Sequence, residues 1–390
     1  MHPFWLIYFL SNRTSFLVSL FFLIYIVILI INNLRNNFIK IEHSSKYDLK
    51  DLTLIIPVRN EKKENLERIK KTYNNKIKFY FVGDARVKPY IYNIGSKKEN
   101  LKKGLELVDT ELVGFLDSDS IVSIEDIKKA ISYFSEKVGG VSGRIFPIKS
   151  KKPSYFYSNF YYRLSDFINY GSSLLNKSQI LNGNFAIYRT DIVKKAFDEI
   201  SSRNIGDDKE LPNYLISSGY DAVLAKDVKI YTDIPTNWKK FLKQVVRWNK
   251  SYILNNFSLI SSGKDRERGI LFSLVIGISL TLLFLTPFSI FLSLVKFSLI
   301  FSHLILSHGL DGKFILFLMH IYLFSSNHLF LIKAVEYLST SIWIIVILSL
   351  LLKNSHSKIH LASISILIQA IAPYLALIYL GKDNWERANG

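Results

Sequence analysis

The sequence predicts an α/β domain carried by membrane-spanning helices, and three observations lead to that fold class. Long apolar runs at 16–31, 270–306 and 361–380 surround a middle of ordinary globular composition. Hydrophobic residues make up 49% of the chain and charged residues 21%, which is too apolar for a simple soluble protein and too charged for one wholly within a membrane. Within the middle, short β-branched runs alternate with charged helical stretches, a pattern that favours a layered α/β sheet.

The apolar runs define the domain organisation. A helix needs about 20 apolar residues to cross a bilayer, and 15–32 nearly supplies them without a cleavage site, so we expect a retained anchor. The run at 270–306 is long enough for two spans, and 343–352 and 361–380 predict two more. We therefore divide the chain into a transmembrane anchor (1–35), an α/β domain (36–236), amphipathic interfacial helices (237–268), transmembrane helices (269–382) and a tail (383–390).

Charge indicates which side of the membrane the domain occupies. The net charge is +18, and basic residues crowd beside the apolar runs. Positive flanks mark the cytoplasmic side, so we expect a multi-pass protein of the cell membrane with a cytoplasmic domain that contacts membrane lipids. No nucleic-acid signature accompanies the charge, so nucleic acid is not an expected partner. The basic residues concerned are Arg35, Lys40, Lys239, Lys240, Lys243, Lys264, Arg266 and Arg268.

The domain opens with three predicted strands, at 52–58, 78–82 and 112–116, separated by helices that end near 73 and span 97–108. Ligands in open α/β sheets bind beyond the carboxyl ends of the strands. Asp84 and Asp117 to Asp119 follow the second and third strands and fall at that edge. The sequence thus predicts a ligand site there.

Two acidic motifs could carry chemistry. Asp117-Ser118-Asp119 can turn its carboxylates toward a divalent ion beside a diphosphate, although the same pair also suits a solvated turn. Because the chain has no cysteine, carboxylates or histidines would have to hold any metal. Asp207 and Asp208 begin a predicted helix, where an acid can serve as a helix cap or as a general base.

A third motif lies on the amphipathic helix predicted at 237–259. Gln244, Arg247 and Trp248 share or border one face of that helix. Arginine binds diphosphate through charge-assisted hydrogen bonds, and an indole offers a flat surface to a sugar ring. An aromatic and basic membrane anchor has the same composition, so this motif alone decides nothing.

Taken in order, the motifs resemble the processive glycosyltransferase family 2 enzymes, in particular the hyaluronan synthase and chitin synthase branch and their cellulose synthase-like relatives. The resemblance covers about 52–252 well and the membrane part only in layout. It is carried by Pro57-Val58-Arg59-Asn60-Glu61, Asp84, Lys97-Lys98, Asp117-Ser118-Asp119, Gly183-Asn184-Phe185-Ala186, Gly206-Asp207-Asp208, Gln244 to Trp248 and Asn384-Trp385-Glu386-Arg387.

The resemblance implies a GT-A fold (nucleotide-diphospho-sugar transferase, Rossmann-like), Mg²⁺ or Mn²⁺, and inversion at the anomeric carbon of a UDP-sugar. Asp208 would be the catalytic base and Asp119, with Asp117, would contact the metal. The expected donor-binding residues are Pro57, Asn60, Glu61, Asp84, Lys97, Asp117 and Arg247. The expected acceptor-binding residues are Gly183, Asn184, Gln244 and Trp248, and Trp385 and Arg387 would close over the site.

The implied activity is processive extension of a polysaccharide from donors of the N-acetylglucosamine or glucuronate type, with translocation through the membrane helices. An even number of spans must then follow the domain if the tail is to reach the active site, which makes 314–332 interfacial. Two alternatives remain open: transfer of one sugar to a lipid-linked acceptor, and a catalytically silent scaffold that has kept the fold. The sequence does not predict an oligomeric state.

Overall fold

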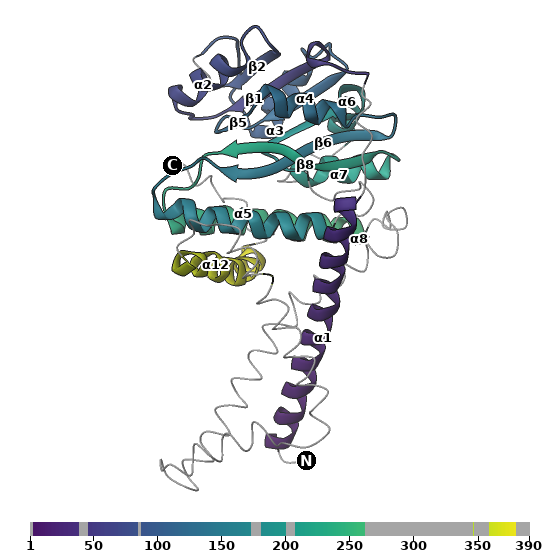
Figure 1. Cartoon of the computed structure of the whole chain (residues 1–390), viewed down its shortest axis with the longest axis vertical. Helices are drawn as coiled ribbons and strands as arrows, with labels where there is room; N and C mark the ends of the chain where they lie inside the picture. Colours follow the sequence, from purple (N-terminus) through teal and green to yellow (C-terminus); the bar gives the residue numbers. More distant parts are fainter. Residues whose placement is uncertain are drawn as a thin grey trace. The chain divides into compact units, whose positions relative to one another are not determined.

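The structure, a computed structural model, describes residues 3–38, 46–84, 87–172, 181–199, 207–261, 346 and 359–379 (Figure 1). The chain divides into two compact units, and the second, 31–272 with 354–390, holds the whole α/β domain. Among the helices in these described ranges, α1 (Pro3–Phe38) alone is long and apolar enough to cross a membrane, over Phe16–Arg35. The spans expected at 270–306 and 343–352 and the segment 314–332 lie outside the described residues, apart from the single residue Val346.

The predicted strands and helices of the domain are confirmed, with shifts of a few residues at their ends. The second unit contains, in chain order, η1 (Leu49–Asp51), β1 (Leu52–Val58), α2 (Lys63–Tyr73), β2 (Lys78–Gly83), β3 (Tyr90–Tyr92), α3 (Lys97–Leu105), β4 (Leu112–Leu116), β5 (Ser120–Val122), α4 (Ile124–Ser132), β6 (Val138–Pro147), α5 (Pro153–Ser172), β7 (Phe185–Arg189), α6 (Thr190–Glu199), α7 (Asp207–Ser217), β8 (Asp221–Thr232), α8 (Trp238–Ser261) and α12 (Ile359–Ile378).

The first half of the sheet is parallel. β1 lies between β2 and β4, and β3 extends the sheet from β2. Every residue of β1 and β4 is buried, as expected of parallel strands covered on both faces. Their carboxyl ends meet at one edge, which is the position that the sequence predicts for the ligand site.

The second half departs from the purely parallel pattern. β7 is antiparallel to both β4 and β6, β8 is parallel to β6, and β5 is antiparallel to β8. The strand order is β3-β2-β1-β4-β7-β6-β8-β5. The Rossmann-like expectation therefore holds for the first half, whereas the second half is mixed because β7 enters the sheet beside β4 from the opposite direction.

Hydrophobic clusters fill both faces of the sheet. On one face, α2 and α4 pack against a cluster that includes Tyr73, Phe81 and Phe134. On the other, α3, α6 and α7 pack against a cluster that includes Phe115 and Phe197. The helices thus hold the strands from both sides and leave the strand ends free to carry polar groups.

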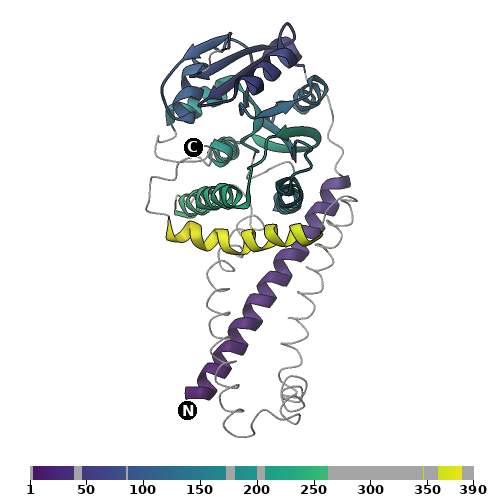
Figure 2. The ribbon, with the colours of Figure 1, turned by 90° about the vertical axis from the view of Figure 1, so that its left-hand side faces the viewer.

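A layer of helices, α5, α8 and α12, lies beside the second half of the sheet, and we call it the helix layer. Figure 2 shows α12 passing across α5, and α12 contacts both α5 and α8. The Ser365 hydroxyl of α12 donates to the Tyr157 carbonyl of α5, and Ala372 and Ala376 are fully buried. The segment expected to span the membrane at 361–380 is a helix, α12, one of whose faces contacts protein, and it is not among the described helices that are long and apolar enough to cross a membrane.

Candidate active site

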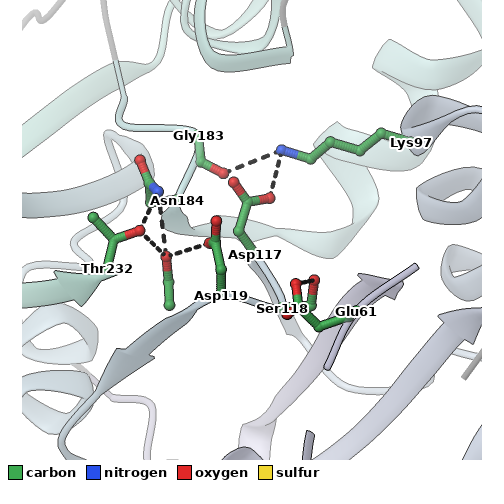
Figure 3. A network of polar contacts seen from close by, with 9 residues as sticks. Glu61, Lys97, Asp117, Ser118, Asp119, Gly183, Asn184 and Thr232 are labelled. Atoms are coloured by element: carbon green, nitrogen blue, oxygen red, sulfur yellow. Dashed lines mark hydrogen bonds and ion pairs between the residues drawn. The ribbon is translucent and has the colours of Figure 1, made fainter. Parts of the chain in front are cut away.

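The turn after β4 is the centre of the site. Asp117 follows the last residue of β4, and its backbone N–H donates to the Asn184 carbonyl at 2.9 Å. That bond joins the turn to the segment leading into β7, so Gly183 and Asn184, both predicted as acceptor contacts, lie beside the Asp117–Asp119 motif (Figure 3). The sequence-predicted groups from distant parts of the chain are brought together here.

Lys97 approaches this turn from α3. A capping box fixes the start of α3: the Ser96 hydroxyl accepts from the Glu99 N–H, and the Glu99 carboxylate accepts from the Ser96 N–H at 2.6 Å. Lys97 is the first helical residue, and its Nζ lies 2.8 Å from Asp117 Oδ1 and 3.2 Å from the Gly183 carbonyl oxygen. One ammonium group therefore joins a predicted donor residue to a predicted acceptor residue.

Asp119 lies in a strongly acidic setting. Its carboxylate accepts a hydrogen bond from the Ser120 hydroxyl at 3.1 Å. Burial, followed by the negative charge of Asp117 and then of Glu61 and Asp233, raises the pKa of Asp119 to about 7. We call Glu61, Asp117, Asp119 and Asp233 the acidic cluster.

Asp233 and Asn65 are parts of the site that sequence reasoning missed. Asp233 follows β8, and its N–H donates to the Asp119 carbonyl at 3.0 Å. The Asn65 amide donates to both Glu61 and Asp233, while the Ser118 hydroxyl donates to Glu61 at 3.0 Å. Asp233 could have been predicted as a site residue from its position after a strand. Asn65 could not, because a polar residue within a helix gives no such signal in the sequence.

A second corner of the site joins β1 to β2. Pro57, predicted as a donor contact, is buried in β1 opposite Val82. Gly83 has φ +140°, and a Cβ there would lie 1.9 Å from the Val58 carbonyl oxygen, so this close approach requires glycine. The turn presents Asp84, whose carboxylate accepts from the Asn60 N–H at 2.9 and 3.2 Å.

The helix that carries the predicted base is tied to α3. α7 begins at Asp207, so Asp208 lies in its first turn, where the helix dipole favours a carboxylate. The side chain of Asp208 lies outside the described part of the chain. Lys98 Nζ is 3.4 Å from the carboxylate of Glu210, which is buried. Because Lys97 and Lys98 are neighbours, α3 contacts both Asp117 and the start of α7.

The third motif lies on α8, as predicted. The Trp248 ring stacks on Tyr161 of α5 with centroids 5.7 Å apart and lies 6.3 Å from Tyr162. Burial, followed by the negative charge of Asp119, raises the pKa of Tyr162, so this ring lies within electrostatic reach of the acidic cluster.

Gln244 Oε1 is buried and makes no hydrogen bond to any described group. Arg247 lies on the same helix and is half-buried. Trp385 and Arg387 lie outside the described residues.

The acidic cluster fits a divalent cation only in part. Within the described ranges, no trio of acids or histidines is grouped closely enough to hold a metal. The acidic cluster nevertheless concentrates negative charge around Asp119, opposed by the Lys97 ammonium at Asp117. Mg²⁺ typically takes one or two carboxylates and completes its coordination with substrate phosphates and water. These side chains therefore suit a cation that arrives with a diphosphate.

Comparison with known proteins supports a transferase. Residues 82–251 match the family described as "Glycosyltransferase like family 2". Hyaluronan synthase 2 of Xenopus laevis is 27% identical over 154 residues, which is 36% of this chain and 28% of that protein. Hyaluronan synthase of Streptococcus pyogenes is 32% identical over 87 residues, 20% of each chain. The chain thus spans less than a third of the length of these relatives.

A solved structure supports the fold. A mannosyltransferase from Pyrobaculum calidifontis, in complex with GDP-Man and Mn²⁺, superposes with a TM-score of 0.52 at 13% sequence identity. The match covers 89% of this chain and 99% of the mannosyltransferase. The domain therefore has a GT-A-like fold.

Proposed function

We propose that this protein is a membrane-integrated, inverting β-glycosyltransferase that extends a polysaccharide from a UDP-sugar, and the match of residues 82–251 to the family described as "Glycosyltransferase like family 2" supports the transferase part of this proposal. The observation that carries the proposal is the arrangement around α3. Lys97 contacts Asp117 at the donor side, and Lys98 contacts Glu210 beside Asp208. A single helix thus links the acidic cluster to the helix that bears the proposed base.

The donor would lie at the carboxyl ends of β1, β2 and β4. Asn60, Glu61 and Asp84 would line the corner proposed for the nucleoside, Pro57 would support it from within β1, and Asp117 and Asp119 would face its diphosphate. Mg²⁺ or Mn²⁺, when bound, would neutralise charge on the leaving diphosphate. Arg247 would add a charge-assisted contact from α8.

Asp208 would act on the acceptor. A carboxylate within hydrogen-bond reach can take the proton of an acceptor hydroxyl as its oxygen attacks the anomeric carbon. The bond from that carbon to the diphosphate oxygen breaks as the new glycosidic bond forms, which inverts the configuration and releases the nucleoside diphosphate. Gly183, Asn184, Gln244 and Trp248 would hold the acceptor, and Trp385 and Arg387 would close the site.

Membrane insertion would use α1 and the apolar segments that follow the domain, with the domain in the cytoplasm. A growing glycan held beside these segments could be extended processively, with N-acetylglucosamine, glucuronate or both as the donor sugar. Addition of one sugar to a lipid-linked acceptor is the second candidate. The structural neighbour's GDP-Man favours including guanosine donors in any test of this chain.

The test is nucleotide release by the purified full chain with Mn²⁺ or Mg²⁺ across UDP-N-acetylglucosamine, UDP-glucuronate and GDP-mannose, with products sized on a gel. We expect release with a UDP-sugar, long products, and loss of both in Asp208→Asn by roughly 10²- to 10⁴-fold. Asp207→Asn removes the same charge one residue earlier and should retain transfer. Short or lipid-borne products would favour single addition, and full activity in Asp208→Asn would eliminate the proposed base.

A further inference from the structure

Asn65 holds a position that no motif explains. It lies on α2, its side chain is only 9% exposed, and its single amide nitrogen donates in two directions. That nitrogen is 2.8 Å from Glu61 Oε1 and 3.1 Å from Asp233 Oδ2. Since an amide NH₂ has two hydrogens, both bonds can form at once. Asn65 therefore joins two carboxylates that come from distant parts of the chain.

Both carboxylates lead back to the turn after β4. The second oxygen of Glu61 accepts from the Ser118 hydroxyl at 3.0 Å. The backbone N–H of Asp233 donates to the Asp119 carbonyl at 3.0 Å. With the peptide bond between Ser118 and Asp119, these contacts close a ring through Asn65, Glu61, Ser118, Asp119 and Asp233, which we call the Asn65 ring.

The chemistry of the Asn65 ring requires a neutral donor between the acids. Two carboxylates at neighbouring positions repel each other, and the buried amide offers each of them a hydrogen bond without adding charge. An aspartate at position 65 would remove both donors and add a third negative charge, whereas alanine would remove the donors alone. Serine could serve only one carboxylate at a time.

We propose that Asn65 is a positioning residue: through Glu61 and Asp233 it holds the Asp117–Asp119 turn in the conformation that receives the metal diphosphate of the donor. The inference rests on the proposed function for its ligand and goes beyond it in naming what fixes the turn. Glu61 acts on the side chain of Ser118, and Asp233 acts on the backbone of Asp119. Cutting the Asn65 ring at any one member should therefore release the same turn.

Binding measurements on the purified full chain test this without catalysis. Isothermal titration with UDP in the presence of Mn²⁺ would compare wild type, Asn65→Ala, Ser118→Ala and the double variant. We expect each single variant to weaken the Mn²⁺-dependent affinity about tenfold, and the double variant to weaken it by no more than that. Residues that act through one network show such non-additivity.

Asn159 provides the matched control, since it is also 9% exposed but lies on α5 and is not a member of the Asn65 ring. Asn159→Ala should leave the affinity unchanged, and thermal unfolding would verify that each variant is folded. Hydrogen exchange gives a second readout: the Asp233 amide should exchange faster in Asn65→Ala and not in Asn159→Ala.

The outcomes separate this inference from the proposed function. Wild-type protein that binds neither UDP nor GDP with Mn²⁺ would overturn the proposed function. Wild-type binding that Asn65→Ala leaves unchanged, or a double variant whose loss is the product of the single losses, would overturn the role of the Asn65 ring alone.

Discussion

The acidic cluster and the helix layer each contain residues of the sequence motifs, yet different forces hold them. In the acidic cluster, charged groups are positioned by hydrogen bonds at strand ends, as between Asp119 and Asp233. In the helix layer, Trp248 is held by aromatic contact with Tyr161, and α12 by packing of small residues on α5 and α8. Hydrogen-bond geometry positions the side chains of the acidic cluster, whereas burial of apolar surface positions those of the helix layer.

Because different forces hold the two regions, substitutions in them should affect different properties of the protein. Substitutions in the acidic cluster should change binding and transfer while the fold survives, because the strands below are held by the two hydrophobic clusters. Substitutions in the helix layer should change stability first, since burial is the dominant source of folding free energy.

The largest expected effect is that of Asp119→Asn on transfer. The amide keeps the shape of the side chain but loses the charge that would face the metal diphosphate, so we expect kcat/KM to fall by roughly 100-fold or more. Nucleotide-release kinetics would measure this, alongside thermal unfolding, which should not fall at pH 7. Normal transfer with an intact fold would break the assignment of chemistry to the acidic cluster.

The next effect concerns the helix layer. Ala372 is fully buried, with 0% of its surface accessible to solvent. A larger side chain there has no free space, so Ala372→Leu should overpack the contacts of α12. We expect about 1–3 kcal/mol of lost unfolding free energy. Ile371, which is 41% exposed on the same helix, provides the control as Ile371→Leu. Equal thermal stability of the two variants would show that α12 contributes little to holding this layer.

Substitutions of Trp248 test whether a residue of the helix layer also contributes to transfer. Trp248→Phe keeps an aromatic ring against Tyr161, whereas Trp248→Ala removes it. We expect Trp248→Ala to reduce transfer and product length by roughly tenfold, because a stacked aromatic contributes about 1 kcal/mol beyond its buried area, and Trp248→Phe to lose less. If both variants lost stability but kept product length, Trp248 would belong to packing alone.

The smallest effect is a pH dependence of stability. The folded state raises the pKa of Asp119 from 3.8 to about 7, so it binds that proton more tightly than the unfolded state does. Stability should therefore fall as pH rises through this window, by on the order of 1 kcal/mol after allowance for solvent screening. Asp119→Asn should remove that slope, which denaturant unfolding at pH 5 and pH 8 would reveal. An identical slope in both proteins would place the Asp119 carboxyl in a better-solvated environment.

The sequence predicted the strand-end positions of Asp84 and Asp117, because strand periodicity and topology act over short distances. Three buried strands, each ending in polar residues, were enough to place Asp84 and Asp117 at one edge of the sheet. The antiparallel entry of β7 was not predictable in this way, since it depends on long-range pairing with β4 and β6. Pairing partners leave no periodic signal in a single strand.

The remaining parts of the site depend on contacts that a sequence pattern does not encode. Asn65 looks like any polar residue on a helix, and its role appears only when α2 is packed beside the end of β8. The stacking of Trp248 on Tyr161 was likewise not predicted from the motif on α8. Side-chain neighbours across elements are set by packing, and tertiary packing overrides local pattern.

The contact of Lys97 with both Asp117 and Gly183 has a consequence for the evolution and engineering of this chain. The segment that precedes β7 and the turn after β4 share a single ammonium group, so they do not form interchangeable modules. A chimera that imports 181–184 from a relative would alter the setting of Asp117 at the same time. Changes in acceptor preference should therefore be epistatic with position 97, and a shift in donor use should accompany them.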